Sequence, residues 1–120
     1  ELTEGSNDVM NEGTTRTPFE IIFEGPINYP EIQNNITGDS FQINYDLPEN
    51  EKIKVYSEFG NKRLIYINDV GEEQKAFSLL DLDSKLFYLE PDNNIITFNA
   101  TMIDGSANAE IKFYDRFLGV

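Results

Sequence analysis

The sequence predicts an all-β protein built as an antiparallel β-sandwich. Apolar and polar residues alternate over several short stretches, which is the pattern of strands that bury one face. Turn-forming residues separate these stretches at intervals of about eight to twelve residues, and no long helical pattern interrupts them, which is typical of sandwiches and barrels. The 120 residues, of which 39% are hydrophobic, suit one domain with one modest core.

The first half of the chain holds most of the alternating stretches. We expect strands over residues 19–24, 40–45, 51–57 and 62–68, with a short strand over 8–11 before them. Gly25 and Pro26 end the first long strand, and residues 47–50 and 59–61 form turns. In the stretch 51–57, Ile53 and Val55 are expected to face the core. The residues between them are expected to face solvent: Lys52, Lys54 and Tyr56.

The second half begins with a charged loop over residues 69–76 and a connection over 77–84. Further strands are expected over 86–89, 95–102 and 107–118. Residues 90–94 form a turn, and residues 104–106, which read Asp-Gly-Ser, have the composition of a hairpin turn. In the last strand Ala109, Ile111 and Phe113 are expected to point inward.

The first residues differ from the rest. Residues 1–7 are polar and acidic and lack apolar periodicity, so we expect a linker or terminal tail there. The sandwich domain is expected to span residues 8–120.

Charge and composition exclude several classes of function. The chain has 22 acidic and nine basic residues and a formal net charge of -13, which argues against binding nucleic acid or an anionic membrane surface. Without His and Cys there is no Ser-His pair, no Cys nucleophile and no zinc site of the usual kind. An enzyme would have to use paired carboxylates, and no pair stands out. We therefore expect a non-enzymatic protein without a cofactor.

Three acidic clusters are candidate calcium sites. They are Asp81 with Asp83, residues 92–94, and Asp69 with residues 72–73. An EF-hand loop needs oxygen ligands at alternate positions and a Gly at the sixth, and none of the three has that pattern. Asp and Asn also form turns through their own side chains, which explains these clusters without a metal.

Two sets of side chains are candidates for a surface that binds a partner or a glycan. Tyr56 and Tyr114 are expected to face outward and could stack on a sugar ring, or they could cover neighbours across strands. The densest basic patch lies around one predicted hairpin and comprises Lys52, Lys54, Lys62 and Arg63. It could meet an acidic face of a neighbouring subunit, or it could protect the sheet edge and form local ion pairs.

Several stretches, in order, resemble a known family. They are residues 11–14, 19–28, 30–32, 35–38, 86–95 and 109–120. Their order and spacing resemble the C-terminal half of the distal tail proteins of the siphovirus tail-component family, over residues 8–120. The chain departs from the family pattern after Pro91, where Asp92 stands in place of the usual Gly.

This resemblance implies a fold and a role. The family's C-terminal domain is a galectin-like or jelly-roll β-sandwich carried outside a hexameric ring that its N-terminal domain forms. The whole protein is a hub at the virion tail tip that joins the tail tube, the tail-associated protein and the receptor-binding proteins. The resemblance thus implies a structural role, synthesis in the host bacterial cytoplasm and a homohexameric full-length protein. The isolated domain is expected to be a monomer or weak oligomer, with host cell-wall glycan recognition as an alternative function.

Overall fold

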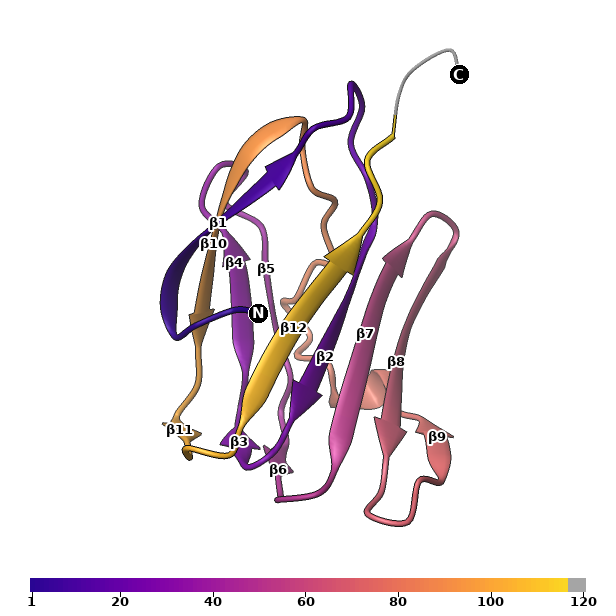
Figure 1. The fold of residues 1–120 in the computed structure, drawn as a ribbon. Coiled ribbons are helices and arrows are strands. Elements are labelled where there is room, and N and C mark those ends of the chain that lie inside the picture. The colour runs from indigo at the N-terminus through magenta and orange to yellow at the C-terminus, as the bar shows by residue number, and fades with distance from the viewer. Residues whose placement is uncertain (117–120) are drawn as a thin grey trace.

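Two antiparallel sheets face each other across one apolar core in the computed structural model, which describes residues 1–116 (Figure 1). The five-stranded sheet has the spatial order β12 (Asn108–Phe113), β2 (Phe19–Glu24), β7 (Lys52–Glu58), β8 (Asn61–Ile67) and β9 (Glu73–Lys75). The four-stranded sheet has the order β1 (Gly5–Asn11), β10 (Asp92–Asn99), β4 (Glu31–Asn34) and β5 (Ser40–Gln42). The predicted all-β antiparallel sandwich is therefore confirmed.

Three very short strands form a small third sheet at one end of the sandwich. Its order is β11 (Met102–Ile103), β3 (Ile27–Asn28) and β6 (Asp46–Leu47). The only helical segment in the described part of the chain is one 3-10 turn, η1 (Phe77–Leu79). The small sheet lets the chain pass from one large sheet to the other, as the path near β3 and β6 shows in Figure 1.

The core forms because inward positions alternate with outward ones along each strand. Ile53 and Val55 on β7 are fully buried, as predicted, and Ile21 and Phe23 on β2 lie opposite them in register. From the other sheet, Phe98 on β10 brings its ring centroid to 5.9 Å from that of Phe23. Such contacts between the inner faces of the two sheets are what hold a sandwich together.

Three predicted elements differ from the observed ones. The charged loop over 69–76 contains an edge strand, β9, whose residues are all exposed. The apolar stretch 86–89 is not a strand; only Leu89 pairs, through an isolated bridge to Thr17. The turn at 104–106 is not a hairpin turn, because β11 pairs with β3 whereas β12 pairs with β2. In each case the structure depends on which distant segment supplies the backbone that pairs with the element, and the local alternation of apolar and polar residues does not encode that choice.

Other boundaries shift by smaller amounts. The predicted strand 40–45 ends at Gln42, after which Ile43 makes one isolated bridge to Leu80. The last strand covers Asn108–Phe113 rather than 107–118, and residues 117–118 lie outside the described part. Asp92 has φ of 79°, a left-handed conformation that Gly adopts more easily.

Residues 1–7 pack onto the sandwich. Leu2 is 5% exposed, and its backbone N–H donates to the carbonyl of Ala109 at 2.8 Å. Gly5 begins β1, so residues 5–7 already pair with β10. Where the domain begins in the gene product stays a prediction.

Buried polar side chains fasten the loops at the end of the four-stranded sheet. The Asn94 side chain accepts from the backbone N–H of Glu90 at 3.0 Å and donates to the carbonyl of Glu90 at 2.9 Å and that of Val9 at 3.3 Å. The amide of Asn34 donates to the same Asn94 oxygen at 3.2 Å. Since buried polar groups are stable only when bonded, these contacts hold β1, β4 and β10 together.

Candidate interaction surfaces

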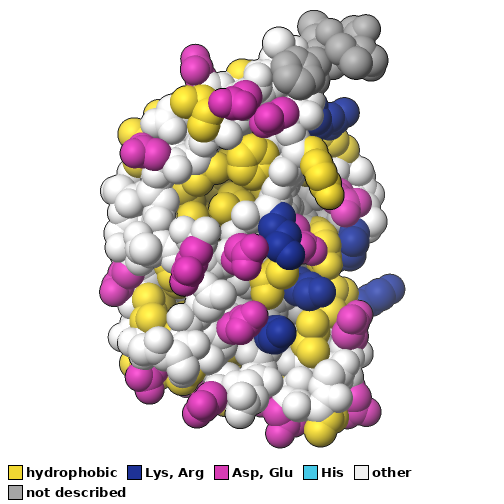
Figure 2. Space-filling view, viewed as in Figure 1, with side chains coloured by type: hydrophobic (Ala, Val, Ile, Leu, Met, Phe, Trp, Pro, Cys, Tyr) yellow, Lys and Arg dark blue, Asp and Glu magenta, His cyan; other side chains and the backbone are white. Residues whose placement is uncertain are grey.

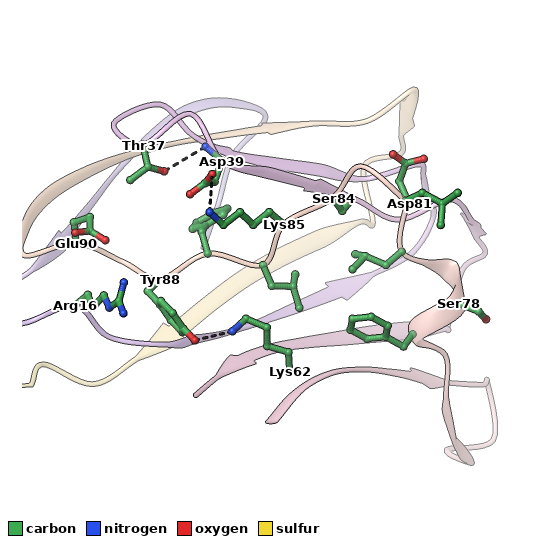
Figure 3. Close-up of a pocket in the computed structure, with 15 residues that line it drawn as sticks. Arg16, Thr37, Asp39, Lys62, Ser78, Asp81, Ser84, Lys85, Tyr88 and Glu90 are labelled. Carbon is green, nitrogen blue, oxygen red and sulfur yellow. Dashed lines mark hydrogen bonds and ion pairs between the residues drawn. The ribbon is translucent and has the colours of Figure 1, made fainter. Parts of the chain in front are cut away.

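A groove of about 670 Å³ lies beside the connection that runs from η1 to Glu90 (Figure 3). Much of its wall is apolar and comes from that connection, which closes the sandwich edge beside β5. The connection is tied to β5 by backbone bonds: Asp81 N–H donates to the carbonyl of Gln42 at 2.9 Å, and Lys85 N–H to that of Ser40 at 2.8 Å. The apolar side chains that line the groove are Phe77, Leu80, Leu82, Leu86 and Phe87.

Cations and aromatic rings meet at one end of this groove. The Lys62 ammonium donates to the Tyr88 hydroxyl at 2.6 Å and lies 4.6 Å from the centre of its ring. The Arg16 guanidinium lies 5.0 Å from the same ring, and Phe59 from the β7–β8 turn packs on it with centroids 4.4 Å apart. Figure 3 shows Arg16, Tyr88 and Lys62 side by side at this end. The arrangement gives the groove a positively charged, aromatic end.

The outer face of the five-stranded sheet is the second surface. Most of the predicted basic patch lies here, because Lys52, Lys54 and Tyr56 point outward from β7 and Arg63 points outward from β8 beside Tyr56. Figure 2 views this face and shows Lys and Arg side chains over the middle of the sheet, interspersed with acidic ones. One exposed ion pair joins Lys52 to Glu24 at 3.7 Å.

Lys62 is separated from the rest of that patch. It lies opposite the inward-facing Ser57 in register, so it points to the other side of the sheet and reaches Tyr88 in the groove. Adjacent residues of a strand point to opposite faces, and therefore Lys62 and Arg63 cannot share a surface.

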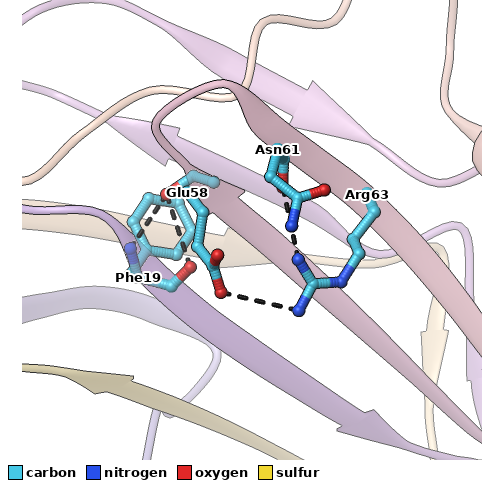
Figure 4. Close-up of polar contacts among 5 residues, drawn as sticks. Phe19, Glu58, Asn61 and Arg63 are labelled. Carbon is cyan, nitrogen blue, oxygen red and sulfur yellow. Dashed lines mark hydrogen bonds and ion pairs between the residues drawn. The ribbon is translucent and has the colours of Figure 1, made fainter.

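Arg63 is held by two neighbours at the end of the hairpin (Figure 4). Its guanidinium lies 3.5 Å from the Glu58 carboxylate and 3.9 Å from the centre of the Tyr56 ring. The same view shows how β2 starts: the Ser57 hydroxyl accepts from the Phe19 N–H at 2.9 Å and donates to the Phe19 carbonyl at 3.3 Å. Burial, followed by the neighbouring Glu20 carboxylate, raises the pKa of Tyr56 above its ordinary value, so the ring stays neutral.

Tyr56 and Tyr114 line one depression on this face, with Glu20, Glu58 and Lys112 around them. Tyr114 is 86% exposed, whereas Tyr56 is half-buried under Arg63. The sequence therefore identified two rings that the structure brings to one place. It missed Tyr88, Phe59 and Arg16, which lie far apart in the chain and meet only after folding.

Within residues 1–116, no group of three or more acidic, His or Cys side chains is arranged to hold a metal ion. No helix in that part of the chain has the length and apolar character needed to cross a membrane.

The fold and these surfaces define an all-β sandwich domain with aromatic and charged side chains gathered on open faces. The sequence model of the siphovirus-type tail component, C-terminal domain, matches residues 12–117. The chain therefore belongs to this family and is a component of a siphovirus-type phage tail, a family whose members work in the virion tail among other tail proteins. Neither the curated proteins nor the solved structures include a significant match.

Proposed function

We propose that this chain is the peripheral domain of a distal tail hub, a non-enzymatic part that connects the tail tube to the tail-associated and receptor-binding proteins. The observation that carries the proposal is the family match over residues 12–117, nearly the whole sandwich. In this view the full-length protein is made in the host cytoplasm and forms a homohexamer at the tail tip. The lack of His and Cys, which removes the usual nucleophile and base pairs, supports a structural role.

Labelling of intact virions tests this position. An antibody against the purified domain, detected with gold particles by electron microscopy, is expected to mark the tail end that is distal to the capsid. Label along the whole tube, or at the capsid, would contradict a hub at the tip. Pre-immune serum on the same virions is the control.

The outward basic patch is the surface that we propose for docking on an acidic neighbour in the tail. It comprises Lys52, Lys54 and Arg63, on a chain whose net charge is -13. The double variant Lys52→Glu/Lys54→Glu is expected to fold and to assemble into fewer tails, because like charges would then face each other. The control, Lys85→Glu, changes a cation outside the patch, one that forms an exposed ion pair with Asp39 at 3.6 Å. Equal assembly by the patch variant and the parent would refute the docking role.

A second candidate function is recognition of host cell-wall glycans. The depression that Tyr56 and Tyr114 share favours this function. An exposed aromatic ring can stack on a sugar, and the neighbouring Glu20 and Glu58 carboxylates can accept hydrogen bonds from the sugar hydroxyls. On an array of cell-wall glycans, binding by the parent that is lost in Tyr56→Ala/Tyr114→Ala would support this function. An array on which the parent binds nothing would exclude it.

A further inference from the structure

Two cations at one end of the groove beside η1 have no carboxylate partner. The Arg16 guanidinium and the Lys62 ammonium lie 5.0 Å and 4.6 Å from the centre of the same Tyr88 ring. Among residues 1–116, neither cation forms an ion pair, although the chain has 22 acidic residues. Glu90 also lines this end of the groove in Figure 3, but one carboxylate does not balance two cations. This end therefore attracts an anionic group from outside the domain.

Polar groups along the middle of the groove are already bonded within the protein. The Ser84 hydroxyl accepts from the Gln42 N–H at 2.9 Å, and the Lys85 ammonium lies 3.6 Å from the Asp39 carboxylate. The Asp81 carboxylate accepts from a neighbouring side-chain amide at 3.1 Å. A molecule that enters the groove therefore need not supply partners for these groups.

Apolar side chains at the η1 end of the groove are open to solvent. Leu82 is 100% exposed and Phe77 is 50% exposed, and both line the groove. Figure 3 shows their chain neighbours Ser78 and Asp81 at the opposite end from Tyr88. Covering this apolar surface would be favourable, and a groove of about 670 Å³ has room for several side chains.

The two ends together select one class of occupant. A nucleic acid would meet a chain of net charge -13 that offers it only Arg16 and Lys62 at this site. A sugar presents many hydroxyl groups, and the apolar wall would leave them without partners. A second copy of this chain would bring the same negative net charge. A protein segment with apolar side chains and a carboxylate at one end matches both parts of the groove.

We propose that this groove binds a segment of another protein in which apolar side chains are followed by an acidic residue. The apolar side chains cover Leu82 and Phe77, and the carboxylate binds at Arg16 and Lys62. The Tyr88 hydroxyl accepts from Lys62 at 2.6 Å, so its own hydrogen is free to donate to that carboxylate. This inference goes beyond the tail role proposed above, because it assigns a ligand class to a surface separate from the outward basic patch.

Nuclear magnetic resonance on the ¹⁵N-labelled chain tests the proposal. The probe is a peptide with blocked ends that carries three leucines followed by two glutamates, and a second peptide has lysines in place of the glutamates. We expect saturable shifts of the Leu82 and Tyr88 amide signals with the glutamate peptide. The lysine peptide is expected to bind the groove at least about tenfold more weakly, because it meets two cations, and high salt should reduce the difference.

A charge variant tests the cationic end. Arg16→Gln/Lys62→Gln neutralises two exposed side chains, so the chain should fold and should bind the glutamate peptide about tenfold more weakly. The matched control is Lys75→Gln/Lys112→Gln, which removes the same charge from two exposed side chains outside the groove. The control should bind the peptide as the parent does.

A second variant tests the apolar end. Leu82→Ser changes a side chain that packs on nothing in the folded chain, so stability should be unchanged while peptide binding falls about tenfold. Val70→Ser is the control, because Val70 is also an exposed apolar residue, 73% exposed, and does not line the groove.

Several results would overturn the proposal. They are no saturable shift at the groove, equal binding of the two peptides, and equal binding by the charge variant and its control. Shifts of the Leu82 and Tyr88 signals that depend on chain concentration without peptide would assign the groove to a second copy instead. Peptide shifts that appear only in a chain ending at Arg116 would assign it to residues 117–120 of the chain itself.

Discussion

The outer faces of the two large sheets differ in chemistry although they enclose the same core. On the five-stranded sheet, Lys52 and Lys54 alternate with glutamates of the neighbouring strands, and the ion pair between Lys52 and Glu24 lies across two strands. On the four-stranded sheet, no strand contains Lys or Arg. Amides, hydroxyls and a few apolar side chains face solvent there, among them Ser6, Gln33, Ser40, Asn93 and Thr97.

The charge of this chain is therefore distributed unevenly between the two sheets. Basic side chains gather over the five-stranded sheet and at the groove beside it, whereas the strands of the four-stranded sheet carry only acidic charge. The two sheets are also anchored differently beneath their surfaces: buried Asn34 and Asn94 hold the four-stranded sheet, whereas Ser57 holds the start of β2 in the five-stranded one. The following variants test that contrast.

The largest effect is expected for Asn94→Ala. Its amide makes bonds to the backbone of Glu90 and Val9 and to Asn34, and truncation leaves these buried groups unpaired. We expect a loss of about 3 kcal/mol in the free energy of unfolding, measured by urea denaturation. The matched control is Asn93→Ala, an exposed neighbour, with an expected change below about 0.5 kcal/mol. Equal effects at both positions would show that the buried amide does not anchor this sheet.

Ser57→Ala should cost less, about 1.5 kcal/mol in the same measurement. The hydroxyl bonds both backbone groups of Phe19, and alanine satisfies neither. Ser6→Ala on the exposed face of β1 serves as the control and should be close to neutral. If Ser57→Ala lowered the free energy of unfolding more than Asn94→Ala does, the five-stranded sheet would depend more strongly on its buried polar anchor than the four-stranded sheet.

Tyr66 makes the stability of the protein depend on pH in the alkaline range. Its hydroxyl donates to Glu51 at 2.5 Å, and this bond, then burial and then Tyr45, raises the pKa of Tyr66 well above its ordinary value. A raised pKa means that the folded state holds the proton more tightly, so stability is fully present below the ordinary tyrosine pKa of about 10 and falls as the pH rises above it. Tyr66→Phe should lower stability near neutral pH and flatten the alkaline decline in urea titrations. An unchanged alkaline slope would contradict this assignment.

The smallest effect is expected on the charged face itself. Glu58→Gln removes the 3.5 Å ion pair with Arg63, which is exposed, so we expect a change below about 0.5 kcal/mol that disappears at high salt. Asp8→Asn on the other face is the comparison and involves no ion pair in the described structure. A larger, salt-independent effect of Glu58→Gln would mean that this pair is structural.

Much of the fold could be predicted from local pattern. Phe19–Glu24 was predicted with its observed bounds, because alternating apolar residues end at Gly25 and Pro26. The strand β9 could not be predicted, since its residues carry no apolar side chain and become a strand only by pairing with β8. The stretch 86–89 shows the reverse error: its apolar side chains bury against the core without joining a sheet.

The candidate surfaces were predictable to a smaller extent. Tyr56 and Tyr114 were expected to be outward, and the structure brings them to one depression. The separation of Lys62 from Arg63 follows from strand alternation, yet the predicted patch combined them. The ring of Tyr88 and the cations over it join segments that are distant in sequence, and no local signal connects such segments.

The sequence by itself determined the fold class, the inward and outward faces of the main strands, and the family. These features depend on the two-residue period of side chains along a strand and on ordered motifs, both of which can be read locally. Only the tertiary structure decided that β12 pairs with β2 instead of β11 and that the backbone of Leu2 pairs with Ala109. Partner choice between strands depends on the burial and hydrogen bonding of distant segments together, and that is settled only when the whole chain packs.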